Sequence, residues 1–154
     1  VEKLRLYEDC HFPLKALYRL EKGLSDALSA RVWLKSGAYL VIEPTEALTV
    51  IDVNTGKYTG GKDKQAAVLK INREAAKEIA RQLRLRNLSG IILVDFIDMD
   101  QAEEKEELLA LMRELLKKDP MKAAAVDLTE LGLMELTRKK QKKTLMEQAK
   151  ECGL

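Results

Sequence analysis

The sequence has little cysteine, histidine, proline or aromatic side chain, and these shortages exclude several classes of protein. Its 154 residues include two cysteines, one histidine and three prolines, and 5% are aromatic. The cysteines, Cys10 and Cys152, lie near opposite ends of the chain, which argues against a disulfide scaffold. A reducing compartment suits this usage, so we expect a cytoplasmic protein. The single histidine, His11, is expected to be incidental.

Long apolar runs and an excess of charge of one sign are also missing. No apolar stretch reaches about 18 residues and nothing at the N-terminus resembles a signal peptide, so we expect no membrane span. The net charge of +2 is too small to indicate a nucleic-acid binder by itself. With 46% hydrophobic residues, the chain fits one globular domain with a real core. It begins at Val1 without a methionine and ends with Cys152-Gly-Leu154, and we expect both ends to be cuts from a longer protein.

The apolar periodicity predicts one mixed sheet with helices packed on it, an α/β (α+β mixed) fold. Strand-like runs stand at Val1–Tyr7, Arg31–Lys35, Ala38–Glu43, Ala47–Val53, Ile91–Val94 and Ala123–Leu128. Helices are expected over Leu14–Ser29, over Lys64–Arg86, from a cap at Asp98 or Asp100 to Asp119-Pro120, and over Leu131–Glu151. Short connections between the second, third and fourth strands indicate an antiparallel meander. The β-α-β crossovers that follow predict parallel neighbours.

Two aspartates at strand ends are the strongest candidates for chemistry. Asp52 and Asp95 each end an apolar strand and are joined through one crossover helix, so both should lie on the same edge of the sheet. Two carboxylates that close repel unless a cation lies between them, and an oxygen-only site suits Mg²⁺ or Mn²⁺. Asn54 should share the face of Asp52 and orient it. From spacing alone, a structural role in turns or caps remains an alternative.

Basic and glycine-rich segments offer weaker candidates. Gly60-Gly61 with Lys57 and Lys62, in an expected loop over Lys57–Asp63, could contact phosphate, but the text matches neither the P-loop nor the dinucleotide pattern. A cluster that we call the basic cluster could contact an RNA backbone or simply form a solvated face. It comprises Arg138, Lys139, Lys140, Lys142 and Lys143.

Four segments resemble the RNase E/G family of bacterial endoribonucleases. They are Thr45–Asn54, Glu78–Gly90, Ile92–Met99 and Leu131–Arg138. Within that family the resemblance is to the DNase I-like catalytic subdomain, which we expect over residues 1–151. Residues 152–154 then correspond to the start of a truncated zinc-link segment.

The resemblance implies cleavage of single-stranded RNA by metal-activated water, leaving a 5′-phosphate and a 3′-hydroxyl, in RNA processing and decay. Asp52 and Asp95 match the family's Mg²⁺ ligands, with Mn²⁺ possible, and Asn54 matches a supporting asparagine. Lys57, Lys62, Arg138 and Lys139 are the expected RNA contacts. The segment from Gly56 to Lys62 departs from proteobacterial members, which tend to have arginines there.

Cys152 falls at about the first cysteine of the family's Cys-x-x-Cys zinc link, which two subunits share. The resemblance therefore implies zinc and a homo-oligomer only in the full-length protein, since a lone cysteine cannot make a tetrahedral site. Two other functions stay open. One is a non-catalytic RNA-binding or assembly module that uses the basic cluster, and the other is a nucleotide-binding domain that uses Gly60-Gly61.

Overall fold

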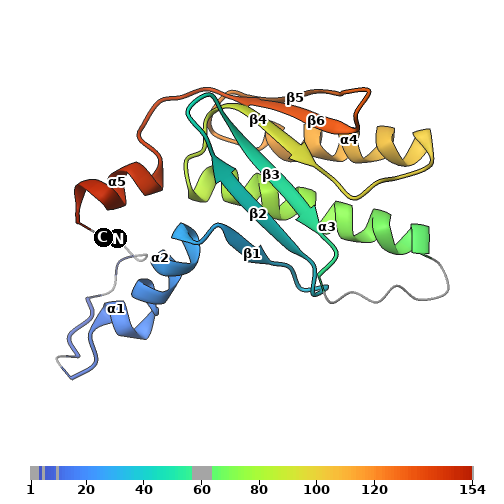
Figure 1. Ribbon diagram of the computed structural model, residues 1–154. Coiled ribbons are helices and arrows are strands. Elements are labelled where there is room, and N and C mark those ends of the chain that lie inside the picture. The colour runs from blue at the N-terminus through green and yellow to red at the C-terminus, as the bar shows by residue number, and fades with distance from the viewer. Residues whose placement is uncertain (1–3, 5, 10, 57–63, 154) are drawn as a thin grey trace.

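The structure is a computed structural model that describes residues 4, 6–9, 11–56 and 64–153. These residues form five helices and one six-stranded sheet (Figure 1). In chain order the elements are α1 (Leu14–Leu17), α2 (Leu20–Leu28), β1 (Arg31–Trp33), β2 (Tyr39–Pro44), β3 (Leu48–Asn54), α3 (Lys64–Leu85), β4 (Gly90–Asp95), α4 (Ala102–Lys117), β5 (Ala123–Leu128), β6 (Leu133–Arg138) and α5 (Leu145–Glu151).

The sheet is mixed, with strand order β1-β2-β3-β4-β6-β5, which confirms the predicted fold class. Strands β1, β2 and β3 form the antiparallel meander, and β3 pairs with β4 in parallel. The prediction of parallel neighbours is wrong for β4 and β5. Strand β6 lies between them and pairs antiparallel with both, because the chain turns back after β5 instead of entering a helix.

The two faces of the sheet differ. On one face, alternate strand residues such as Leu40, Ile51, Ile92 and Leu136 are almost completely buried. They share one core with residues of α3 and α4, and Figure 1 shows both helices behind the strands. The alternate residues point away from these helices. We call that side the open face, and it includes Val50 and Ile91, which are 36% and 52% exposed.

The long crossover helix α3 follows the predicted stripe. Ile71, Ala75, Ile79 and Leu83 are each at most 2% exposed, at the four-residue spacing that keeps them on one side of a helix. The helix ends where Asn87 takes a left-handed backbone conformation with φ of 50°. The chain then enters β4 directly, which places the end of β4 beside the end of β3.

Four other expectations need correction. The described residues Leu4, Leu6 and Tyr7 form no strand, and the helix expected over Leu14–Ser29 is two helices. Arg19, at φ of 50°, interrupts it. Gln101 occupies the N-cap of α4 without a capping hydrogen bond from its side chain, so neither expected aspartate caps that helix. The helix expected over Leu131–Glu151 is strand β6 followed by the shorter helix α5. The loop expected over Lys57–Asp63 lies outside the described residues.

Candidate metal site on the open face

Asp52 and Asp95 lie directly opposite each other at the ends of the parallel strands β3 and β4. Ile51 and Val53 on β3 and Val94 on β4 point into the core, so the alternation of the strands turns both aspartates to the open face. Neighbouring strands are about 4.8 Å apart, so the two carboxylates project side by side. Asp52 is half-buried and Asp95 is exposed, which leaves the pair accessible to solvent.

Asn54 holds one oxygen of the first aspartate. Its side-chain Nδ2 donates a hydrogen bond of 2.7 Å to Oδ2 of Asp52. The two residues are separated by one position on β3, so the strand alternation places them on the same face. This bond restricts the rotation of the Asp52 carboxylate.

The electrostatics of the pair disfavour two negative charges. Partial burial, and then the negative charges of Asp52 and Asp98, raise the pKa of the Asp95 carboxyl above its ordinary value. Among the described residues, neither Asp52 nor Asp95 forms a salt bridge that would offset this repulsion. A cation held between the carboxylates would offset it.

The donor set fits a hard cation that the protein ligates only in part. In the part of the chain that the structure describes, no three acidic, histidine or cysteine side chains gather closely enough to hold a metal ion. The site therefore offers two carboxylates. Mg²⁺ is commonly bound through one or two carboxylates, with waters and substrate phosphates completing the shell. The residues present are compatible with such an ion.

The four residues predicted to contact RNA differ in where the structure places them. Lys57 and Lys62 lie outside the described residues, and Lys139 is exposed directly after β6. Arg138 is only 4% exposed, and its guanidinium donates to both carboxylate oxygens of Asp119, to Oδ1 of Asn87 and to the Leu88 carbonyl. Its hydrogen-bonding capacity is used inside the protein, so we correct its role to a structural one.

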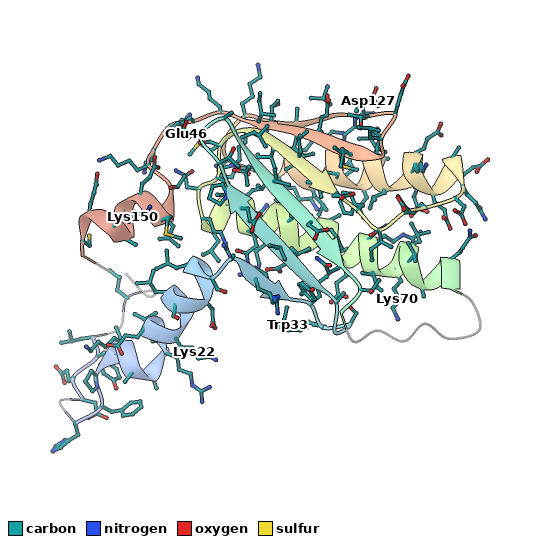
Figure 2. All side chains as sticks on the ribbon, viewed as in Figure 1. Lys22, Trp33, Glu46, Lys70, Asp127 and Lys150 are labelled. Carbon is teal, nitrogen blue, oxygen red and sulfur yellow. The ribbon has the colours of Figure 1, made fainter. Side chains whose placement is uncertain are left out.

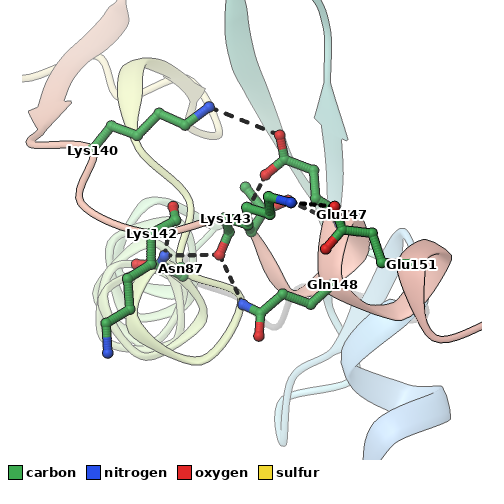
Figure 3. Close-up of polar contacts among 8 residues, drawn as sticks. Asn87, Lys140, Lys142, Lys143, Glu147, Gln148 and Glu151 are labelled. Carbon is green, nitrogen blue, oxygen red and sulfur yellow. Dashed lines mark hydrogen bonds and ion pairs between the residues drawn. The ribbon is translucent and has the colours of Figure 1, made fainter.

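Two members of the basic cluster, Lys140 and Lys143, form ion pairs with helix α5 (Figure 3). Lys140 lies 3.8 Å from a Glu147 carboxylate oxygen, and Lys143 pairs with Glu151. Asn87 donates to the carbonyls of Lys142 and Lys143 at 3.1 and 3.0 Å and fixes the segment before the helix. The side chains paired in this way are less available to a ligand. The acidic residues of α5 were the sequence signal for these pairs.

Cys152 is an exposed free thiol at the C-cap of α5. Figure 1 shows α5 beyond the end of the sheet where β2 ends and β3 begins, whereas the aspartate pair is at the opposite end of β3. The expected zinc-link position is therefore separate from the candidate metal site.

Trp33 and Tyr39 were not predicted as functional residues, although both lie on the open face near the aspartates. They are register partners on β1 and β2, and Tyr39 is also the register partner of Asn54. The alternation of Val32 and Leu40, which point the other way, with these aromatic residues was the signal that could have found them.

The structure thus defines a mixed α/β domain with a paired-carboxylate site at the ends of adjoining parallel strands. The sequence model of the Ribonuclease E/G family matches residues 1–141. The chain belongs to this family, which confirms the resemblance.

Several relatives have similar sequences. Ribonuclease E of Synechocystis sp. is 47% identical over 152 residues, which cover 94% of this chain and 23% of the relative. Ribonuclease G of Haemophilus influenzae is 44% identical, covering 94% of this chain and 29% of the relative. Ribonuclease G of Escherichia coli is 41% identical over 86% of this chain and 27% of the relative. The chain therefore spans about a quarter of the length of these relatives.

Among the described residues, no helix is both long enough and apolar enough to cross a membrane.

Proposed function

We propose that the chain is the DNase I-like catalytic subdomain of a Mg²⁺-dependent endoribonuclease that hydrolyses phosphodiesters of single-stranded RNA. The products would carry a 5′-phosphate and a 3′-hydroxyl, and the role would be RNA processing and decay. The observation that carries the proposal is the register of Asp52 opposite Asp95 on parallel strands. The names of the relatives, ribonuclease E and ribonuclease G, support RNA as the substrate.

In this proposal Asp52 and Asp95 hold the metal, with Mn²⁺ as a substitute for Mg²⁺. A bound divalent ion supplies charge neutralisation at the phosphate and lowers the pKa of a coordinated water. The chain's own contribution is position. Buried neighbours such as Ile51 and Val94 fix the two strand ends, and the Asn54 amide fixes one oxygen of Asp52. Both carboxylates lie on the open face, where the RNA strand would bind.

Lys57, Lys62 and Lys139 remain proposed contacts to the RNA backbone. The exposed thiol of Cys152 is accessible for a zinc link between subunits of the full-length protein, which would be a homo-oligomer. The proposed compartment is the cytoplasm, where a free thiol of this kind stays reduced.

A non-catalytic RNA-binding or assembly module is the second candidate. It would depend on the basic cluster, and the burial of Arg138 together with the pairing of Lys140 and Lys143 reduces the charge available there. The third candidate, nucleotide binding at Gly60-Gly61, rests on residues outside the described part of the chain.

The test replaces each aspartate by its uncharged isostere. Asp52→Asn and Asp95→Asn, in the complete protein, should each lower the Mg²⁺-dependent cleavage of a short end-labelled single-stranded RNA by about a hundredfold or more. Each variant loses one charged metal ligand while its side chain keeps its size.

Asp127→Asn is the matched control, because Asp127, labelled in Figure 2, is an exposed aspartate on β5, which β6 separates from β4. Circular dichroism checks that each fold is retained. If both active-site variants cleave like the parent protein, the proposal is wrong. If the parent protein shows no Mg²⁺-dependent cleavage, while its RNA binding falls after charge removal at Lys139 and Lys142, the second candidate is favoured.

A further inference from the structure

A cation and two aromatic rings lie together on the open face, next to the aspartate pair. The ring centroids of Trp33 and Tyr39 are 5.1 Å apart with the planes tilted by 56°. The Arg31 guanidinium carbon lies 4.5 Å from the Tyr39 centroid and 5.9 Å from the Trp33 centroid. We call these three residues the aromatic platform.

The strand register places the platform beside the aspartates. Trp33 is opposite Tyr39, Tyr39 is opposite Asn54, and Arg31 lies in the same cross-strand row as Asp52 and Asp95, through Val41. Directly opposed residues share one face of a sheet, and strands are about 4.8 Å apart. The backbone of Trp33 is therefore about 10 Å across the sheet from that of Asn54.

The platform is exposed without serving the core. Trp33 is 56% exposed, while Val32 and Leu40 supply the apolar contacts on the opposite face. No salt bridge of Arg31 occurs among the residues that the structure describes. Its charge is held above the two aromatic rings, whose faces attract an exposed cation. An exposed tryptophan ordered in this way is prepared for a ligand with a π face and negative charge.

We propose that Arg31, Trp33 and Tyr39 bind an unpaired nucleobase and its phosphate one or two nucleotides from the phosphate held at Asp52 and Asp95. This inference rests on the proposed function, and it assigns the strand's path across β1 and β2. Single-stranded nucleic acids bind through aromatic stacking and a positive groove, and stacking tolerates any base because every base has a π face. The platform therefore confers affinity and position rather than sequence preference.

Aromatic and arginine side chains also anchor protein partners. RNA is the favoured occupant because the platform and the aspartate pair share one face, and because Arg31 supplies charge that complements a phosphate backbone.

The experiment uses Trp33 itself as the reporter, because it is the only tryptophan in the sequence. The chain is titrated with hexauridylate in a chelating buffer, so that neither cleavage nor metal binding contributes. Hexauridylate should quench the fluorescence of Trp33, and a ribose-phosphate hexamer of equal charge without bases should not. Tyr39→Leu should raise the half-saturating concentration about tenfold or more, as expected for a lost stacking contact.

Tyr18→Leu is the matched control, since Tyr18 is 68% exposed and lies between α1 and α2, away from the open face. Its titration should equal that of the parent chain. The proposal is overturned if hexauridylate does not quench Trp33, which would leave a protein partner as the occupant. It is also overturned if the hexamer without bases quenches equally, which would show an effect of charge alone.

A kinetic readout separates this inference from the proposed function. In the complete protein, Trp33→Leu should raise KM for RNA about tenfold with a smaller change in kcat, and Trp33→Phe should restore most of the loss. Quenching that persists while Asp52→Asn and Asp95→Asn still cleave RNA would reject the catalytic proposal and keep the platform. Loss of cleavage in those variants without any quenching of Trp33 would reject the platform alone.

Discussion

Asp95 carries an electrostatic cost that the metal-free fold does not offset. Partial burial and the charges of Asp52 and Asp98 raise the pKa of its carboxyl in the folded state. A raised carboxyl pKa means that the fold favours the protonated form over the ionised form. The contribution of Asp95 to stability is then greatest below the unfolded-state pKa, and it is lost as the pH rises through the higher folded-state pKa.

Asp95→Asn should therefore make the metal-free protein more stable at pH 7, because it removes the repulsion with Asp52. The gain in melting temperature should shrink as the pH falls below about 4, where carboxyl groups are largely protonated. Thermal melts in a chelating buffer between about pH 3 and pH 8 would measure it. Asp127→Asn, on strand β5, which β6 separates from β4, should show no such gain. A variant that melts with the parent protein at pH 7 would contradict the electrostatic reading.

Individual residues differed in how far the sequence could predict them. Asp52, Asn54 and Asp95 could be predicted from the sequence, because strand alternation and the ends of apolar runs are local signals. The structure puts all three on one face. The buried position of Arg138 could not be predicted from the sequence. Its partner Asp119 is 19 positions away along the chain, and the pairing of β6 with β5, where Arg138 is opposite Ala123, brings the two together. The catalytic roles of Asp52, Asn54 and Asp95 remain predictions.

Strand β6 shows why an element was predicted wrongly. Met134, Leu136 and Arg138 alternate inward along the strand, and Gly132 precedes it at φ of 83°. The third inward residue is charged, which hid the alternation and favoured a basic helix. Arg138 can occupy the third inward position because Asp119, whose side chain is 0% exposed, neutralises its charge. The Asp119 carboxyl pKa is lowered, with burial opposing and the hydrogen bonds and charge of Arg138 favouring the ionised form.

Arg138→Met should therefore destabilise the protein by about 3–5 kcal/mol, because it leaves the buried Asp119 charge without its partner. Lys139→Met, at the neighbouring exposed position, should change stability by less than about 0.5 kcal/mol. Urea denaturation gives both values. The double variant Asp119→Ala/Arg138→Met should recover part of the loss, since no unpaired charge remains. If Arg138→Met and Lys139→Met lowered the free energy of unfolding equally, the Arg138–Asp119 pair would not anchor β6.

At the scale of the whole molecule, helices α3 and α4 cover one face of the sheet, and the proposed chemistry lies on the other. The meander and the β3–α3–β4 crossover follow from short-range signals, which is why the sequence predicted the neighbouring strand ends. The insertion of β6 between β4 and β5 could not be predicted in the same way, because it depends on pairing between distant segments. With β6 beside β4, the aspartate pair lies at the ends of two central strands rather than on an edge strand.

A metal ion bound between Asp52 and Asp95, at the ends of these central strands, should stabilise the whole fold. Two carboxylates repel in the free protein, and an ion that binds only the folded state adds RT ln(1 + [L]/Kd) to the free energy of unfolding. At ten times Kd this is about 1.4 kcal/mol, or a rise of about 3–6 °C in Tm for a domain of this size. Thermal melts with increasing MgCl₂, against NaCl of equal ionic strength, would measure it.

The Asp52→Asn/Asp95→Asn double variant is the control for this experiment, because both proposed ligands are then neutral. Its Tm should respond to MgCl₂ no more than to NaCl, since only screening remains. If the parent chain and the double variant shift equally, Mg²⁺ acts through the surface charge as a whole. The paired register of β3 and β4 would then have no metal-binding role in this chain, even though the two carboxylates lie side by side.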